Sequence, residues 1–189
     1  MHLVVGLGNP GARYARTRHN VGFLAVERAA SRAGATVEKK LFGALVGDGS
    51  LADTKVMFAL PQQFMNLSGQ PVASILGFYK IPQKDMIVVH DDMDLPFGRL
   101  RVRVGGGHGG HNGIRDIHRL VGTEFVRVRV GVGRPPEQMD PADWVLSGWS
   151  ATESAALDSL LDSAADAVES VVRVGVTQTM NTFNAVPSA

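Results

Sequence analysis

Short apolar runs alternate with segments of helical spacing, and this alternation constrains the fold most. Leu3–Leu7 and Met86–Val89 hold a few apolar residues before glycine or polar side chains, which is typical of buried strands. Between them, residues 21–33 carry apolar side chains at helical spacing, with Asn20 placed to cap the start and Gly34 to follow the end. Strands alternating with helices indicate an α/β domain.

A predicted hairpin makes the sheet mixed. Phe42–Asp48 and Thr54–Leu60 resemble strands joined by a Gly-Asp-Gly-Ser turn, and Pro71–Tyr79 predicts a helix with proline in its first turn. A length of 189 residues suits one domain. We therefore expect residues 1–189 to form a single α/β domain, with a twisted mixed β-sheet flanked by helices on both faces.

Arginines alternate with apolar residues in two later strands, 99–104 and 126–130. This period of two places the apolar side chains inward and the arginines on the opposite face, namely Arg99, Arg101, Arg103, Arg127 and Arg129. The net charge is only +1, which excludes a uniformly polycationic nucleic-acid tail. The arginine face is either a solvated sheet surface or, if the basic blocks 1–40 and 95–134 share it, a phosphate-binding field.

The C-terminal third is acidic. A polar loop is expected from Arg134 to Asp143, and a capping box from Ser150 to Glu153 opens a helix predicted over 150–172. Its predicted inner face comprises Ala156, Leu157, Leu160, Leu161, Ala164, Val168 and Val171, and its acidic outer stripe comprises Asp158, Asp162, Asp166 and Glu169.

The composition removes several kinds of chemistry. The absence of cysteine excludes disulfides, zinc–thiolate sites and a cysteine nucleophile, and there is no G-x-S-x-G motif. The chemistry that remains is activation of water by a general base, with neutral amide side chains as hydrogen-bond donors. No apolar run is long enough to span a membrane, and the N-terminus lacks the basic and apolar regions of a signal peptide. We therefore expect a cytoplasmic protein with no membrane partner.

Candidate catalytic residues stand at predicted loop junctions. His19 lies where a loop enters a helix, and Asp91 follows a strand end, where α/β sheets place catalytic groups. Such a pair can form a general base, with the carboxylate fixing the imidazole tautomer. The glycine-rich segment 105–113 leads into a helix predicted over 112–120, whose free N–H groups would face an anion or a reacting carbonyl.

Other functions fit parts of this pattern. Gly6–Gly11 matches the dinucleotide fingerprint G-x-G-x-x-G, although a polar stretch intervenes before the first helix. A metallohydrolase could use His90, Asp91, Asp92, Asp94, His108 and His111, whose spacing matches no familiar metal motif. An RNA-binding module without catalysis would explain the arginines but not the histidine, aspartate and asparagines.

Several motifs, in order and spread over nearly the whole chain, resemble the bacterial-type peptidyl-tRNA hydrolase family. They are Gly6-Leu-Gly-Asn-Pro-Gly11, Tyr14, Thr17-Arg-His-Asn20, Phe64-Met-Asn-Leu-Ser-Gly69, His90-Asp-Asp-Met-Asp-Leu-Pro96, Gly107–Gly113, Arg127–Pro135 and Met180–Asn184. Two residues depart from the family pattern: Gln63 stands where Thr or Ser is more common, and Trp149 stands where Phe is common.

The resemblance implies hydrolysis of the ester between a peptide and the 3′ ribose of tRNA, with His19 as the general base that activates water. It implies that Asp91 orients His19, and that the substrate carbonyl, the peptide backbone and the water are positioned by Asn9, Asn66 and Asn112. It further implies a cleft lined by Tyr14, Phe64, Met65 and His111. Arg103 and Arg129 would hold the tRNA 5′-phosphate. Neither a cofactor nor a metal is expected. Peptidyl-tRNA is the expected partner of a monomer without an obligate protein partner, and we expect a lid at 135–147.

Overall fold

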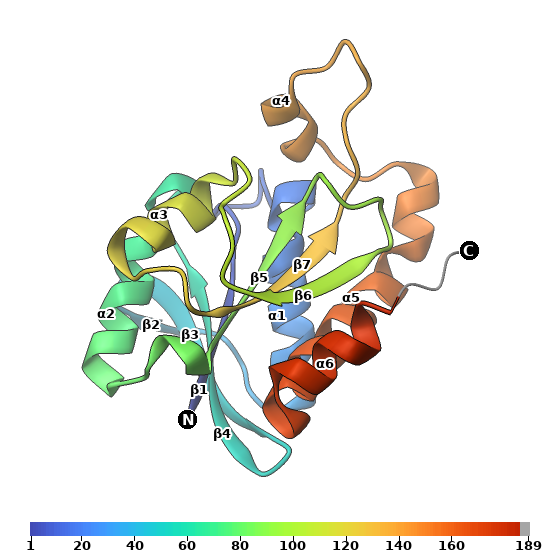
Figure 1. Ribbon diagram of the computed structural model, residues 1–189. Helices are drawn as coiled ribbons and strands as arrows, with labels where there is room; N and C mark the ends of the chain where they lie inside the picture. Colours follow the sequence, from blue (N-terminus) through green and yellow to red (C-terminus); the bar gives the residue numbers. More distant parts are fainter. Residues whose placement is uncertain (186–189) are drawn as a thin grey trace.

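Seven strands form one mixed sheet at the centre of the molecule (Figure 1). The structure is a computed structural model and describes residues 1–185. In sheet order, the strands are β2 (Lys39–Leu41), β3 (Ala44–Leu51), β4 (Thr54–Pro61), β1 (His2–Gly6), β5 (Met86–Asp92), β7 (Val126–Gly131) and β6 (Leu100–Val104). The four strands β4, β1, β5 and β7 are parallel, whereas β2, β3 and β6 run antiparallel to a neighbour. The predicted mixed sheet is confirmed.

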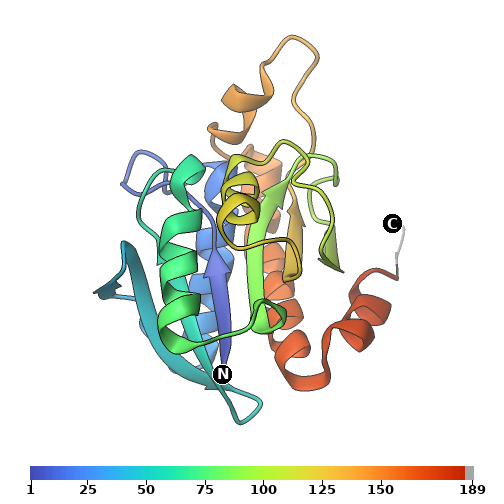
Figure 2. The same ribbon diagram turned by 60° about the vertical axis from the view of Figure 1, so that its left-hand side comes forward.

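Helices cover both faces of this sheet, as predicted (Figures 1 and 2). One face carries α1 (Val21–Arg32), α5 (Ala151–Val174) and α6 (Val176–Phe183), and the other carries α2 (Gly69–Tyr79) and α3 (Asn112–Leu120). Successive β5 residues alternate between the two cores: Ile87 and Val89 pack with α1 and α5, and Val88 packs with α2 and α3. The expected domain extends to residue 189, and its last four residues lie outside the described part of the chain.

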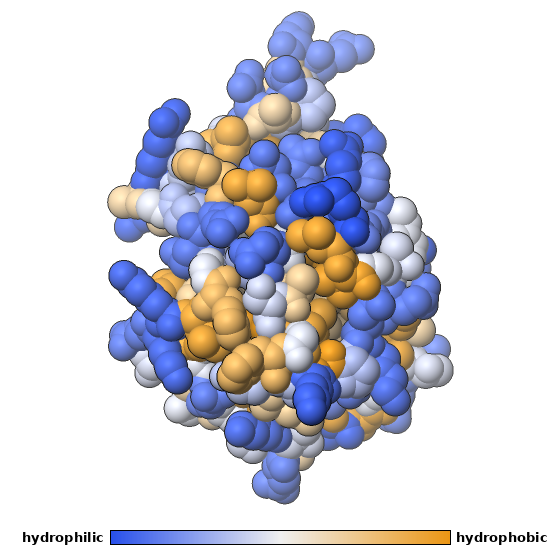
Figure 3. Space-filling view, turned by 90° about the vertical axis from the view of Figure 1, so that its left-hand side faces the viewer, coloured by the Kyte–Doolittle hydropathy of each residue, from blue (hydrophilic) through white to orange (hydrophobic). Residues whose placement is uncertain are grey.

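The face formed by α2 exposes apolar side chains, which Figure 3 shows as orange areas between hydrophilic ones. Phe78 is 66% exposed and Phe42 is 39% exposed, and their ring centroids lie 5.3 Å apart.

The chain also forms three short 3₁₀ helices within residues 1–185: η1 (Arg18–Asn20), η2 (Met65–Leu67) and η3 (Gln83–Asp85).

The segment expected as a polar loop up to Asp143 contains a short helix, α4 (Pro141–Val145), so that prediction is wrong. The Asp140 carboxylate accepts a hydrogen bond from the Ala142 N–H (2.9 Å), and Pro141 occupies the first turn. An Asp-Pro pair is a recognised helix start, which the run of prolines before it obscured.

The hairpin between β3 and β4 turns at Ala52 and Asp53, whose φ angles are 49° and 61°, and not at the Gly-Asp-Gly-Ser sequence. Gly47 and Gly49 lie inside β3. A Cβ on Gly47 would come within 2.4 Å of the Thr36 carbonyl oxygen, so glycine lets the chain leaving α1 cross close to the strand. These glycines therefore reflect backbone packing and not a turn.

Three aspartates of the acidic stripe of α5 form ion pairs with arginines of α1. Arg28 pairs with Asp158 (2.9 Å) and Asp162 (2.6 Å), and Arg32 pairs with Asp162 (3.1 Å) and Asp166 (2.5 Å). Two charges of the N-terminal basic block are thereby neutralised, so they add little to a phosphate-binding field.

The capping box of α5 is present: Ser150 Oγ accepts from the Glu153 N–H (3.1 Å), and Glu153 Oε1 accepts from the Ser150 N–H (2.8 Å). Ala156, expected inward, is exposed because α5 contacts the core only from Leu157 onward. None of the helices within residues 1–185 has both the length and the apolar character to cross a membrane.

Candidate active site

A cleft of about 650 Å³ lies at the carboxyl ends of the parallel strands. Loops from distant parts of the chain meet there, as expected for an α/β sheet. The predicted site residues that line it are Asn9, His19, Phe64, Met65, Asn66, Asp91, Arg103, His111, Asn112 and Arg129. Tyr14 is set back from the cleft and contacts Phe64 edge-on, with ring centroids 6.3 Å apart.

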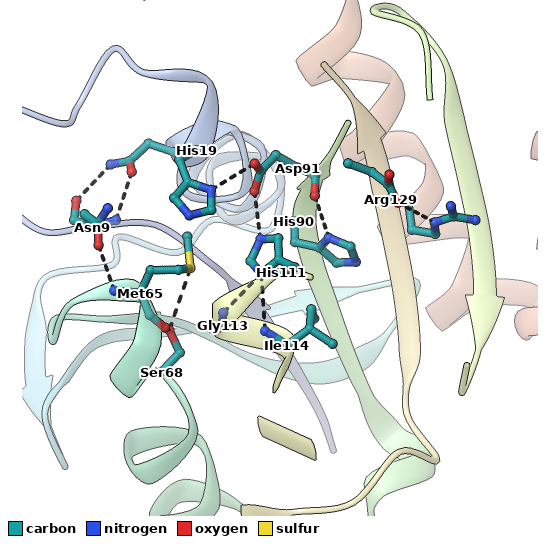
Figure 4. A network of polar contacts seen from close by, with 12 residues as sticks. Asn9, His19, Met65, Ser68, His90, Asp91, His111, Gly113, Ile114 and Arg129 are labelled. Atoms are coloured by element: carbon teal, nitrogen blue, oxygen red, sulfur yellow. Dashed lines mark hydrogen bonds and ion pairs between the residues drawn. The ribbon is translucent and has the colours of Figure 1, made fainter. Parts of the chain in front are cut away.

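Asp91 lies between two histidines (Figure 4). Its Oδ2 is 2.9 Å from Nδ1 of His19, and its Oδ1 is 2.8 Å from Nε2 of His111. The carboxylate is buried, with 3% of its side chain exposed, whereas His19 is 12% exposed at the cleft. The fold therefore brings together the His19–Asp91 pair, which the sequence had only suggested.

His111 is tied to the start of α3, and this contact fixes its tautomer. Its Nδ1 accepts hydrogen bonds from the N–H groups of Gly113 (3.1 Å) and Ile114 (3.3 Å), so the ring proton lies on Nε2 and is donated to Asp91. These backbone N–H groups were expected to face an anion or a reacting carbonyl. That expectation is wrong, because the His111 side chain already uses them.

Burial and charge act in opposite directions on the pKa values of His19 and Asp91. Burial is the largest influence on His19 and by itself lowers its pKa, but the charge and hydrogen bond of Asp91 together raise that pKa above the usual value. Burial also works against ionised Asp91. The interactions with His19 and His111 outweigh burial and hold the pKa of Asp91 well below its usual range. The carboxylate is therefore ionised at neutral pH and favours protonation of His19.

Asn9 is held from both sides. Oδ1 of Asn20 accepts from the Asn9 N–H (2.8 Å), and Nδ2 of Asn20 donates to the Asn9 carbonyl (2.9 Å). Asn9 Oδ1 accepts from the Met65 N–H (2.7 Å), which leaves Nδ2 of Asn9 free to donate into the cleft. The predicted place of Asn20 immediately before α1 is confirmed, but its side chain makes no capping bond to that helix and bonds Asn9 instead. The spacing of eleven residues gave no signal for this pairing.

Asn66 and Asn112 are both exposed on the cleft wall. Asn66 comes from η2 and Asn112 from the first turn of α3, where its Oδ1 accepts from Arg115 (3.3 Å). Amide side chains therefore line the cleft from three different segments of the chain. A set of neutral donors and acceptors of this kind suits recognition of carbonyl and N–H groups.

The arginine face divides into two environments. Arg103 is exposed, and Arg129 donates through Nε to Asp92 (2.7 Å), so both side chains reach the cleft. Arg127 is only 3% exposed, so its expected place on an open polar face is wrong. Its guanidinium lies under the glycine-rich loop, which covers this part of the sheet. Strand alternation alone does not reveal such a cover.

The segment expected as a lid is anchored beside His19. The Arg18 guanidinium lies 3.4 Å over the Trp144 ring, donates to the Trp144 carbonyl (3.3 Å) and to Ser147 Oγ, and pairs with Glu153 (2.7 Å). No motif in the sequence indicated this contact, because 126 residues separate Arg18 from Trp144.

The glycines of the first loop have a packing role. A Cβ on Gly6 would approach the Gly22 carbonyl oxygen to 2.4 Å, and one on Gly8 would approach the Phe23 ring to 2.8 Å. The first long helix after the loop begins only at Val21. The glycine pattern therefore serves close packing of α1 on β1, and the helix start that dinucleotide binding needs is absent at Gly11.

The six residues considered as metal ligands do not gather at one point. His90 is buried and bonds the Asp91 carbonyl through Nδ1 (2.8 Å) and the Arg127 Nε–H through Nε2 (3.2 Å). A different triad, His19, Asp91 and His111, has ligand atoms within 4.8 Å of one another. Its atoms already satisfy each other, and His111 Nε2 carries a proton while Nδ1 caps α3, so the donor set fits a hydrogen-bonded triad better than a cation site.

A buried carboxylate that holds a cleft-facing histidine, with amide side chains nearby, is an arrangement that suits a hydrolytic enzyme of α/β fold. The family model described as "Peptidyl-tRNA hydrolase" matches residues 3–189. The chain belongs to the peptidyl-tRNA hydrolase family.

Relatives and solved structures agree with this assignment. Peptidyl-tRNA hydrolase of Chloroflexus aurantiacus is 49% identical over 97% of this chain and 99% of its own length. That of Anaeromyxobacter sp. strain K is 48% identical over 97% and 96%, respectively. The crystal structure of peptidyl-tRNA hydrolase from Acinetobacter baumannii matches with a TM-score of 0.93 and 39% identity, covering 100% of this chain and 97% of that chain.

Proposed function

We propose that this protein hydrolyses the ester between the peptide, or N-blocked aminoacyl group, and the 3′ ribose of tRNA. The observation that carries the proposal is the contact between His19 Nδ1 and Asp91 Oδ2 at 2.9 Å, with His19 at the cleft. The carboxylate accepts a hydrogen bond from the Nδ1–H of His19. Nε2 of His19 then carries the lone pair that can take a proton from water.

The reaction needs one proton acceptor and no covalent intermediate. The water oxygen attacks the ester carbonyl carbon while its proton passes to Nε2 of His19, and Asp91 stabilises the imidazolium. The carbon–oxygen bond to the ribose then breaks, and the 3′ oxygen takes a proton from His19. A positioned general base contributes roughly 10²–10⁴-fold to such a reaction.

Asn9 is the residue best placed to act on the carbonyl. Its Oδ1 is occupied by the Met65 N–H, so Nδ2 is the group it presents to substrate. A preorganised donor to the developing oxyanion is worth about 10²–10³ in rate. We assign Asn66 and Asn112 to the peptide backbone and the water because both stand exposed on the cleft wall.

The amide-lined cleft supports selection of blocked substrates. A peptide offers an N–H and a carbonyl to these side chains, whereas a free α-ammonium group would carry its charge into a partly desolvated site. Unmatched polar groups of this kind can give discrimination of about 10⁴. Tyr14, Phe64, Met65 and His111 would frame the peptide, with Tyr14 acting through its contact with Phe64.

Arg103 and Arg129 would receive the tRNA 5′-phosphate. Arg129 already shares Nε with Asp92, which leaves its two terminal nitrogens for phosphate oxygens. Phosphate contacts position a nucleic acid without reading its sequence, which suits an enzyme acting on many tRNAs. Residues 135–147 would close over the bound end as a lid.

The proposal also includes the oligomeric state, the lack of a cofactor and the location in the cell. The enzyme acts as a monomer without a cofactor, a metal or an obligate protein partner. It works in the cytoplasm, where translation leaves peptidyl-tRNA.

The decisive experiment compares initial rates on N-acetyl-aminoacyl-tRNA and on the same aminoacyl-tRNA left unblocked, with EDTA throughout. Rapid, blocked-selective and EDTA-resistant turnover is expected. Binding of both tRNAs without turnover would identify an RNA-binding module, and loss of turnover in EDTA would identify a metallohydrolase.

A further inference from the structure

Within the described residues, the hydrogen bonds of the Arg127 guanidinium go to neutral acceptors. Its Nε donates to His90 Nε2 (3.2 Å), and Nη1 donates to the carbonyl oxygens of Gly105 (3.3 Å) and Gly107 (2.8 Å). Its pKa falls to about 10, because burial disfavours the charge and Arg129 and Arg103 repel it, and these effects outweigh the attraction of the Asp92 carboxylate. A buried cation without a paired carboxylate is costly, so the contacts it makes require an explanation.

His90 is suited to hold this guanidinium only in its neutral form. Its Nδ1 bonds the Asp91 carbonyl, which leaves Nε2 as an acceptor for Arg127. Burial lowers the pKa of His90 well below its usual value, with a smaller effect from nearby His111 and Arg127. A hydrogen-bonded path therefore runs from the backbone of the catalytic carboxylate, through His90 and Arg127, to the glycine loop.

The glycine loop, residues 105–110, connects two parts of the site. Gly105, Gly106, Gly109 and Gly110 have φ angles between 60° and 86°, so the loop has little conformational preference of its own. At Gly106 a Cβ would lie 2.2 Å from the Arg103 guanidinium, so this side chain rests on the loop. At its far end the loop delivers His111 to Asp91.

We propose that Arg127 is a positioning residue, which with His90 fixes the path of the glycine loop and thereby sets His111 against Asp91. The kinetic consequences of this inference rest on the proposed function. The anchoring of the glycine loop by Arg127 does not depend on any activity. Arg127 then acts on the loop backbone and not on tRNA.

Arg127→Lys separates positioning from phosphate binding. Lysine keeps the charge, but its single ammonium cannot reproduce the fork that serves His90 and two carbonyls at once. We expect kcat to fall about tenfold on both N-acetyl-aminoacyl-tRNA and the N-acetyl-aminoacyl ester of adenosine. The salt dependence of KM for the tRNA should stay as in the parent, and amide hydrogen exchange of 105–113 should quicken at least tenfold. Arg173→Lys is the matched control, since Arg173 lies on α5 paired with Glu169.

His90→Asn shortens the side chain, so no acceptor remains at the position of Nε2 for Arg127, and it provides a second variant if Arg127→Lys folds poorly. If both residues act along one path, the double variant loses about as much kcat as Arg127→Lys alone. Additive losses, unchanged loop exchange, or a loss confined to tRNA substrate with a shallower salt dependence would each overturn the proposal. A parent protein without any turnover would contradict the proposed function instead, and the exchange measurement would still test the anchor.

Discussion

The Asn20 side chain makes two hydrogen bonds with the backbone of Asn9, donating to its carbonyl at 2.9 Å and accepting from its N–H at 2.8 Å. This contact holds the loop after β1 against the first turn before α1. The Asn9 side chain can then bond the Met65 N–H and keep its Nδ2 directed to the cleft. The position of the amide group that we propose for the substrate carbonyl thus depends on a residue that does not itself line the cleft.

Asn20→Asp should remove one of these two hydrogen bonds, the one donated to the Asn9 carbonyl. The acid keeps an acceptor for the Asn9 N–H but places a carboxylate oxygen against the Asn9 carbonyl in a buried site. An unmet buried polar group costs about 1–3 kcal/mol, so urea unfolding should shift to lower denaturant and kcat should fall. Asn181→Asp, on the exposed side of α6, makes the same chemical change as a control. Parent-like kcat in Asn20→Asp would show that Asn9 needs no such support.

His19→Ala should remove most of kcat, by about 10²–10⁴-fold, and leave tRNA binding in place. Binding measured by fluorescence anisotropy and turnover measured under saturating substrate separate the two effects. If the variant keeps more than about a tenth of parent kcat, the general base is another residue.

The pH profile should report the raised pKa of His19. Because Asp91 raises that pKa above 6.5, the neutral base is lost as pH falls through a value above 6.5, and kcat/KM should decline on that acidic side. In Asp91→Asn, burial lowers the His19 pKa unopposed. The acidic limb should then move to lower pH while the plateau falls by up to about 10⁴-fold, because the imidazole loses its tautomer control. A limb that stays in place in Asp91→Asn would mean that another group titrates.

The placement of Asp91 at the candidate site could be predicted from sequence because strand ends are easily recognised. Short apolar runs located β1 and β5, and residues that follow parallel strands meet at one edge of the sheet, so Asp91 was expected in the site. What no local pattern revealed was the partner of each polar group. Asn20 resembles a helix cap, yet it bonds the backbone of Asn9.

Period-two alternation assigns a side chain to a face but not to an environment. Arg127 and Arg129 share a face of β7, yet one lies under the glycine loop and the other beside Asp92. Likewise, the glycines of β3 suggested a turn, whereas the close approach of Thr36 explains Gly47. In both cases a segment distant in sequence covers the residue, and only tertiary structure brings that segment there.

Arg103→Ala and Arg129→Ala should raise KM for N-acetyl-aminoacyl-tRNA and make it less dependent on salt. Each arginine that neutralises a phosphate releases counterions, so its loss should reduce the slope of log KM against log salt by about one. Cleavage of the N-acetyl-aminoacyl ester of adenosine, which lacks the 5′-phosphate of tRNA, should be unchanged. Equal losses on both substrates would refute the phosphate assignment.

Arg18 divides the lid segment into an anchored and a projecting part. Stacking on Trp144 and the bonds to Trp144 and Ser147 hold the end of the segment beside His19, whereas residues 136–140 are exposed. Hydrogen exchange should therefore slow on substrate binding at 136–143 and change little at 144–148. Arg18→Gln removes the stacked charge, and the anchored part should then exchange as fast as the projecting part, with KM raised more than kcat is lowered. Exchange that substrate leaves unaltered throughout 135–147 would show that the segment does not close.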